Sequence, residues 1–207
     1  CIRDRSCDNL GRLHAAVFGA GLYRLEAESW RRLTDISDRG SDKVQAIAFD
    51  RENTLWAATS NESLAGWKDG KWYSSAGGGQ QLPRDIRTLA VDDAGGLWLS
   101  TVRGVVHVGG PNLRSWMINP ASDFSFARFD QNDGLDSEQC IRNESGIYRD
   151  TRGRIWVGTS RGLSVIDPAE FRKEQEATTP RTLQIGAVIL DDQVVWTPAS
   201  SLSLIHI

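Results

Sequence analysis

The feature that most constrains this chain is a short segment that occurs four times along its 207 residues. Each copy has an aspartate, and six residues later comes an anchor position that holds tryptophan in three copies and histidine in the first. Successive anchors are 42, 42 and 58 residues apart, in the pairs Asp8–His14, Asp50–Trp56, Asp92–Trp98 and Asp150–Trp156. A repeat of about 40 to 50 residues is typical of a propeller blade, which is a four-stranded antiparallel sheet. The sequence therefore predicts an all-β fold with one blade per copy.

Alternating apolar and polar residues around each aspartate predict the strands, called a to d in chain order. The residue three positions before the anchor is glycine or asparagine, which tolerate the positive φ of a hairpin turn between strands a and b. Strand a is expected at 44–49 and 86–91, strand b at 54–59, 96–101 and 154–159, and strand c at 21–25, 104–108 and 162–166. Strand d carries an aromatic residue 16 positions after the anchor, Trp30 and Trp72.

The third interval is longer than the others by 16 residues, which we expect to lie between Gly109 and Phe126. The fourth strand of that blade contains either Trp116 or the segment Phe126–Phe129, and the sequence leaves the two alternatives open.

Composition is that of an ordinary globular protein, with 40% hydrophobic residues, 25% charged residues and a net charge of -3. A nucleic-acid partner would favour a basic excess, so none is expected in this region. No run of apolar residues reaches the roughly 18 that a membrane span requires.

The segment Asp150–Leu163, DTRGRIWVGTSRGL, resembles the two-component regulator propeller repeat of bacterial sensor proteins, D-x-x-G-x-[LI]-W-[IV]-G-T followed by G-L. The third copy matches with Ser100 in place of a glycine, and the second with Asn53 and Ala58 in place of two glycines. The first copy matches more loosely. The resemblance covers residues 1 to about 170 and implies a partial propeller of about four four-stranded blades, with further blades expected outside this sequence.

The resemblance also suggests how the chain is divided. Residues 1–170 form the blades, and 171–179 a polar linker. Residues 180–201 resemble the first strands of the small β-sandwich called the Y_Y_Y domain, which follows the propeller in that family. Residues 202–207, LSLIHI, resemble a translated sequencing adapter, with an apolar strand that ends the domain as the alternative.

The repeated residues are expected to be structural. Aspartate side chains bind the backbone N–H groups of their own turn, and a tryptophan fills the space between blades. A sialidase Asp box places aspartate five residues before tryptophan, whereas the spacing here is six. We therefore assign scaffold roles to Asp50, Trp56, Asp92, Trp98, Asp150, Gly153, Trp156 and Gly162.

No pattern predicts catalytic, metal-binding or cofactor-binding residues. The three histidines, His14, His107 and His206, are isolated, and zinc-site spacings, G-x-S-x-G and the phosphate loop are absent. The cysteines form no framework, so Cys7 and Cys140 are either free thiols or a disulfide pair.

The connections from strand b to c and from d to the next blade vary in sequence, and we call the edge of the blades that carries them the loop rim. The a–b and c–d turns lie on the opposite edge, which we call the turn rim. Variable loops on a rigid scaffold are the usual place for binding. We therefore expect Asn61, Arg103 and Arg161 to contact a ligand, with solvated loop side chains as the alternative.

The resemblance implies a periplasmic, ligand-sensing module of an inner-membrane protein, such as a sensor histidine kinase or a diguanylate cyclase. Its ligand would be a small molecule or a glycan, its output domain would lie downstream in the same chain, and the full-length protein would form a homodimer. This region itself is expected to have no enzymatic activity. Alternatives are a propeller lyase or glycosidase, and a non-catalytic propeller that binds another protein.

Overall fold

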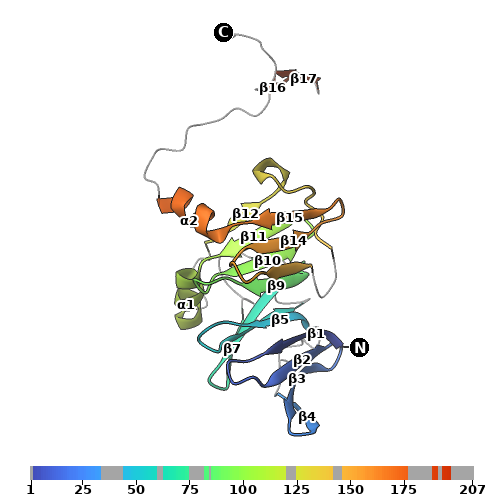
Figure 1. The fold of residues 1–207 in the computed structure, drawn as a ribbon, viewed down its shortest axis with the longest axis vertical. Coiled ribbons are helices and arrows are strands. Elements are labelled where there is room, and N and C mark those ends of the chain that lie inside the picture. Colours follow the sequence, from blue (N-terminus) through green and yellow to red (C-terminus); the bar gives the residue numbers. More distant parts are fainter. Residues whose placement is uncertain are drawn as a thin grey trace. The chain divides into compact units, whose positions relative to one another are not determined.

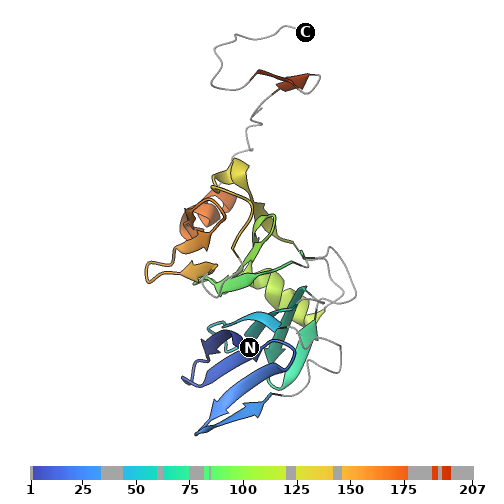
Figure 2. The ribbon, with the colours of Figure 1, turned by 90° about the vertical axis from the view of Figure 1, so that its right-hand side faces the viewer.

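The computed structural model describes residues 2–33, 44–59, 63–74, 82–83, 85–119, 125–141, 146–176, 188–190 and 193–196. The chain divides into two compact units, Cys1–Ala169 and Glu170–Ile207 (Figure 1). The first unit contains one antiparallel sheet for each copy of the repeat, and the views in Figures 1 and 2 show these sheets following one another in chain order. The predicted fold, a mainly β propeller arrangement of four blades, is confirmed.

Blades 1 and 2 each have four strands paired in chain order. Blade 1 consists of β1 (Ile2–Cys7), β2 (Leu13–Val17), β3 (Gly21–Glu26) and β4 (Ser29–Arg32). Blade 2 consists of β5 (Val44–Phe49), β6 (Leu55–Thr59), β7 (Ser63–Lys68) and β8 (Lys71–Ser74).

Blade 3 contains the long interval. Its strands are β9 (Thr88–Val91), β10 (Leu97–Thr101), β11 (Gly104–Val108) and β12 (Ala127–Phe129), and the 3-10 turn η2 (Gln131–Asp133) follows. Between β11 and β12 the chain forms helix α1 (Gly110–Ile118), so the extra residues lie where the sequence predicted them. The structure also resolves the open choice of fourth strand, because the segment ending at Phe129 pairs with β11 whereas Trp116 lies on α1.

Helix α1 is an insertion that packs through one face. Pro111 lies in its first turn, where a missing N–H costs no helical hydrogen bond. Leu113 and Trp116, three residues apart, are each 1% exposed. The Trp116 ring lies 6.2 Å from that of Trp56, which brings the helix of blade 3 against blade 2.

Blade 4 has three strands among the described residues, β13 (Ile147–Arg149), β14 (Ile155–Gly158) and β15 (Leu163–Ile166). Helix α2 (Pro168–Glu176) comes next and includes part of the segment predicted as a linker. Further on, β16 (Val188–Leu190) and β17 (Gln193–Trp196) form a hairpin within the predicted sandwich segment. Residues 202–207 lie outside the described residues.

The blades pack face to face, with their first strands adjacent in the order β1, β5, β9 and β13. We call the side of each sheet that carries the anchor residue its anchor face, and the other side its opposite face. The anchor face of blade 2, with Trp56 and Ala58, shares one buried cluster with Leu97 and Leu99 on the opposite face of blade 3. Blade 1 packs on blade 2 in the same way. Burial of these apolar surfaces is the main source of stability in such an array.

Candidate functional site

The repeated aspartate organises the a–b turn of its blade. One carboxylate oxygen of Asp50 accepts the backbone N–H groups of Glu52 and Thr54, at 2.9 and 2.8 Å. The other oxygen accepts the indole N–H of Trp56 at 3.0 Å. Asp92 and Asp150 make the corresponding three bonds in blades 3 and 4. The six-residue spacing therefore lets one carboxylate hold both its turn and its anchor.

The turn also explains the glycine or asparagine three residues after the aspartate. The backbone N–H of Asn53 donates to the carbonyl of Asp50 at 3.1 Å, and Asn53 has a φ of 62°. Gly95 and Gly153 take the same conformation, at 76° and 83°. Only glycine and, at small cost, asparagine adopt this left-handed region readily. Strand b begins one residue later than predicted in blades 2 to 4, because the amide of the preceding residue is bound by the aspartate.

The carboxylates of Asp92 and Asp150 are held in the ionised form. Burial would raise the pKa of Asp92, but hydrogen bonds from His107, Trp98 and the backbone of Gly96 outweigh it and lower the pKa to about 2. The hydrogen bond from Trp156, together with those from Arg154, holds the pKa of Asp150 well below its usual value. A carboxylate of this kind is a poor general acid at neutral pH.

In blades 1 and 4 the second carboxylate oxygen binds an arginine side chain. Arg12 Nε lies 2.7 Å from Asp8 Oδ2, and Arg154 Nε lies 2.8 Å from Asp150 Oδ2. In both blades the arginine comes four residues after the aspartate, so the ion pair lies within a single turn.

In blade 3 the partner of the second carboxylate oxygen is a histidine from a different strand. Blade 3 has Gly96 at the arginine position, and His107 on β11 reaches across, with Nε2 3.3 Å from Asp92 Oδ2. The His107 ring also lies 4.4 Å from that of Trp98. A Cβ at Gly96 would come within 2.6 Å of His107 Nε2, so the glycine makes room for the histidine. His107 is isolated in the sequence, but in the structure it contacts the aspartate that organises the a–b turn of its blade.

Two of the predicted ligand residues, Arg103 and Arg161, lie on the loop rim. Arg103 and Arg161 are exposed and occupy corresponding b–c turns of blades 3 and 4. Their backbone N–H groups donate to Thr101 Oγ1 at 2.9 Å and Thr159 Oγ1 at 3.3 Å. Asn61 lies outside the described residues. A role for these three in binding stays a prediction.

One segment joins the two described turns of the loop rim. The carbonyl of Glu138 accepts the N–H of Gly104 at 2.7 Å, and the carbonyl of Gln139 accepts the N–H of Ser160 at 2.8 Å. The connection between blades 3 and 4 therefore contacts both of the turns that carry Arg103 and Arg161.

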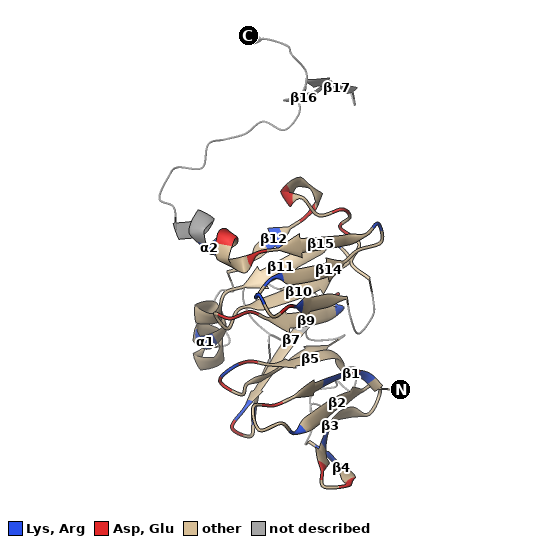
Figure 3. Cartoon of the chain, viewed as in Figure 1, with Lys and Arg blue, Asp and Glu red and all other residues tan. Residues whose placement is uncertain are grey.

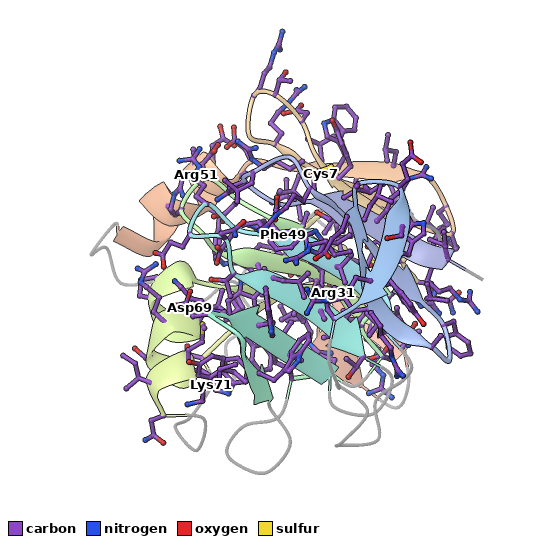
Figure 4. The ribbon with its side chains drawn as sticks, turned by 90° about the horizontal axis from the view of Figure 1, so that it is seen from below. Cys7, Arg31, Phe49, Arg51, Asp69 and Lys71 are labelled. Carbon is purple, nitrogen blue, oxygen red and sulfur yellow. The ribbon has the colours of Figure 1, made fainter. Side chains whose placement is uncertain are left out.

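A pocket of about 440 Å³ lies on the turn rim, between blade 2, blade 3 and α1. Its apolar lining includes Trp56, Tyr73, Leu113, Met117 and Ile118. In Figure 4, the labelled residues Arg51, Asp69 and Lys71 of blade 2 lie on the same side as α1, and Arg51 is itself part of the lining. Sequence reasoning missed this pocket. Its only signal was the 16-residue insertion, which gave no sign of where α1 would pack.

Charged groups of both signs surround this pocket. Glu52 pairs with Lys68 at 2.8 Å and with Arg114 at 4.0 Å, and Arg51 pairs with Asp93. The hydrogen bond between Glu52 and Lys68 lowers the pKa of Glu52 and raises that of Lys68. Figure 3 shows the same interspersed charges over the described blades. A site with an apolar lining and charged groups of both signs around it is suited to a small neutral or zwitterionic molecule.

Within the described ranges, no three histidine, cysteine, aspartate or glutamate side chains are grouped as metal ligands. In the same part of the chain, no helix is both long and apolar enough to cross a membrane.

Comparison with solved structures shows the same fold in extracellular domains of bacterial proteins. The extracellular domain of a protein from B. thetaiotaomicron named as a hybrid two component system aligns with a TM-score of 0.62 and 19% identity, over 84% of this chain and 23% of that one. A second B. thetaiotaomicron extracellular domain, from a protein named as a one component system, gives a TM-score of 0.57 and 18% identity over 79% and 21%. This chain thus spans less than a quarter of either.

The fold is not confined to such extracellular domains. A streptogramin B lyase aligns with a TM-score of 0.52 and 10% identity, over 79% of this chain and 53% of that one. At such identities the likeness concerns the fold alone. A search of curated proteins gave no match.

The sequence comparison is more specific. Residues 139–161 match the family model described as the two component regulator propeller. They include Gln139, whose carbonyl binds the loop-rim turn of blade 4, the Asp150 turn and all of β14. This chain therefore carries a two component regulator propeller repeat in its fourth blade, on a fold shared with extracellular domains of two-component systems.

Proposed function

We propose that this chain is a ligand-sensing, extracytoplasmic module of a bacterial signal-transduction protein of the sensor histidine kinase or diguanylate cyclase type. The observation that carries the proposal is the two component regulator propeller match at residues 139–161. The similar extracellular domains from B. thetaiotaomicron support it. The likeness to a lyase does not favour an enzyme, because the carboxylates of the repeated aspartates accept hydrogen bonds from their own turns and anchors.

The mechanism that we propose is a change in how neighbouring blades are held. The pocket is lined by blades 2 and 3, and the turns that carry Arg103 and Arg161 belong to blades 3 and 4. A ligand at either place therefore contacts two blades. Such a ligand shifts a conformational equilibrium only by its difference in affinity for the two states. We propose that the shift passes through a Y_Y_Y sandwich beginning at residues 180–201 to a membrane helix and an output domain, within a homodimer.

A thermal-melt screen of the purified chain against small molecules and glycans tests the sensing role. A ligand at 100 times its Kd stabilises the folded state by about 2.7 kcal/mol. Replacing Arg103 and Arg161 by glutamine tests the loop rim, and Met117→Glu tests the pocket. Stabilisation that is lost in one variant and kept in the other locates the site, whereas a screen without any stabilising compound would argue against a sensor.

The complete reading frame gives a second, independent test. A membrane helix followed by a kinase or cyclase domain is the expected outcome. A stop codon soon after the sandwich would contradict a signalling role. Turnover of a polysaccharide by the purified chain would instead favour the lyase or glycosidase alternative.

A further inference from the structure

The pocket on the turn rim has walls that belong to the middle of the chain. Blade 2 packs between blades 1 and 3, and blade 3 packs between blades 2 and 4. Trp56 and Leu113, two of the lining residues, are each 1% exposed. Asp50 accepts the indole N–H of Trp56, and Trp116 of α1 packs against the Trp56 ring. The apolar walls are therefore in place before a ligand binds, which lowers the entropic cost of binding.

Helix α1 forms one side of this pocket, and its first residue allows it to do so. Gly110 begins the helix and is part of the pocket lining. A Cβ at Gly110 would lie 2.7 Å from the carbonyl oxygen of Ala94, in the a–b turn of blade 3, so only a glycine lets the helix approach that turn so closely. The volume of about 440 Å³ is near the lower end of the range for ligand sites, roughly 300 to 1,000 Å³. The pocket therefore suits a small molecule.

The charged side chains around the pocket balance one another. The described part of the lining contains three acidic and three basic side chains, which are Asp50, Glu52, Asp93, Arg51, Lys68 and Arg114. Hydrogen bonds from Lys68 and from Arg149 lower the pKa of Glu52 and of Asp93 respectively, so both stay ionised at neutral pH. A ligand with charge of one sign only would be repelled by half of this set. The set therefore favours a ligand that is neutral or carries one charge of each sign.

One pair in this set has hydrogen-bonding capacity left for a ligand. Arg51 pairs with Asp93, and Lys68 Nζ lies 2.8 Å from Glu52 Oε2. Arg114 Nη1 lies 4.0 Å from Glu52 Oε1, which is too far for a hydrogen bond. The side chains of Arg114 and Glu52 are both about half exposed, at 53% and 54%. A guanidinium group and a carboxylate oxygen thus lie close together at the pocket without a direct hydrogen bond.

We propose that this pocket binds a free α-amino acid with an apolar side chain. The carboxylate of the ligand binds Arg114, its ammonium group binds Glu52, and its side chain lies against Met117 and Ile118 of the lining. The two charged groups of an α-amino acid are attached to one carbon atom, so they match a cation and an anion that lie 4.0 Å apart. A guanidinium group can bind a carboxylate through two parallel hydrogen bonds. Such an amino acid would be the ligand of the proposed sensing function, on which this proposal rests.

The aromatic residues of the pocket favour an amino acid over a glycan. Trp56 is 1% exposed, and the Lys71 ammonium group lies over the Tyr73 ring, 5.1 Å from its centre. Little aromatic surface is therefore left for a sugar ring to stack on. The most exposed apolar side chain of the lining is aliphatic, since Ile118 is 88% exposed. An apolar ligand side chain that covers such a surface gains about 25 cal/mol for each Å² removed from water.

Calorimetric titration of the purified chain with L-leucine, L-methionine and L-phenylalanine tests the ligand class. We expect saturable binding, and a melting temperature that rises with the concentration of the amino acid that binds. Isocaproate lacks the ammonium group of leucine, and isoamylamine lacks its carboxylate. Each should bind more weakly than leucine by about tenfold or more, because one of the two charge-assisted contacts is lost. L-glutamate should lose about as much, since its side-chain charge would lie on the apolar lining.

Substitutions test whether the amino acid binds in this pocket. Arg114→Gln and Glu52→Gln should each weaken binding by about tenfold or more. Arg114→Lys should weaken it less than Arg114→Gln, because lysine keeps the charge but not the paired hydrogen bonds. Arg31→Gln is the matched control, since Arg31 is 67% exposed on blade 1 and has a similarly loose pair, 3.6 Å from Glu26. It should leave binding unchanged, and a thermal melt without ligand checks that each variant is folded.

Failure of this proposal can be distinguished from failure of the sensing function. Absence of binding by all three amino acids, or binding that Arg114→Gln leaves unchanged, would overturn the amino-acid pocket. Stabilisation of the chain by a different small molecule or a glycan would in that case leave the sensing function standing. A screen without any stabilising compound would argue against both.

Discussion

Asp93, in the a–b turn of blade 3, forms an ion pair with Arg149 at the end of β13, and the same carboxylate oxygen also binds Arg51 of blade 2. One turn residue thus connects three successive blades. The hydrogen bond from Arg149, together with the charge of Arg51, lowers the pKa of Asp93. Because the carboxylate is 41% exposed, solvent screens both pairs, and each contributes at most about 1 kcal/mol.

Asp93→Asn should therefore destabilise the chain by about 1 kcal/mol, and the loss should shrink in high salt. Urea unfolding at low and high ionic strength measures both effects. Asp69→Asn is the matched control, since it removes the same charge from an exposed turn of blade 2. An equal loss in the two variants would show that net charge, rather than the junction, is responsible.

Asp92 should make stability depend on acid pH. Its folded-state pKa of about 2 lies below its ordinary value of 3.8, so its contribution is present above about pH 4 and is lost as the pH falls toward 2. The shift corresponds to about 2 kcal/mol. We expect the urea midpoint to fall across this interval and to fall less in Asp92→Asn, which has no carboxylate to protonate. An unchanged slope in that variant would assign the pH dependence to other carboxylates.

The turn of blade 3 can be converted into that of blade 4. Gly96→Arg alone should destabilise the chain by about 1 to 3 kcal/mol, because a Cβ there would lie 2.6 Å from His107 Nε2 and 2.9 Å from Asp92 Oδ2. Adding His107→Val copies the Arg154 and Val165 arrangement of blade 4 and should restore most of the loss. A double-mutant cycle measures the coupling. Additive effects of the two changes would show that His107 does not occupy the arginine site.

Helix α1 should depend on Trp116 for its place against blade 2. Trp116→Ala removes a side chain that is 1% exposed and should cost about 3 to 5 kcal/mol. Ile118→Ala, at a position 88% exposed on the same helix, should change stability by less than about 0.5 kcal/mol. Thermal or urea unfolding distinguishes them. Similar small effects of both would mean that the helix is not part of the cooperative unit.

The repeat allowed much of the fold to be predicted. The distance of six residues between aspartate and anchor, with glycine or asparagine between them, specifies a turn whose hydrogen bonds are all local. Strands b and c could be predicted from the alternation of residues, because neighbouring residues such as Trp98 and Leu99 are buried on opposite faces of the sheet. The site was less predictable. The pocket needs Lys68, Asp93 and Leu113, which come from separate elements and carry no common sequence signal.

Local sequence was sufficient wherever one blade makes its own contacts, as Asp150 does with Trp156 six residues later. The packing of blades and of α1 was decided by the tertiary structure, because it depends on partners far apart in sequence. The carboxylate of Asp92 illustrates both cases. Its bonds to Ala94, Gly96 and Trp98 follow from the repeat, whereas the approach of His107 follows from the pairing of β10 with β11 and from the space that Gly96 leaves.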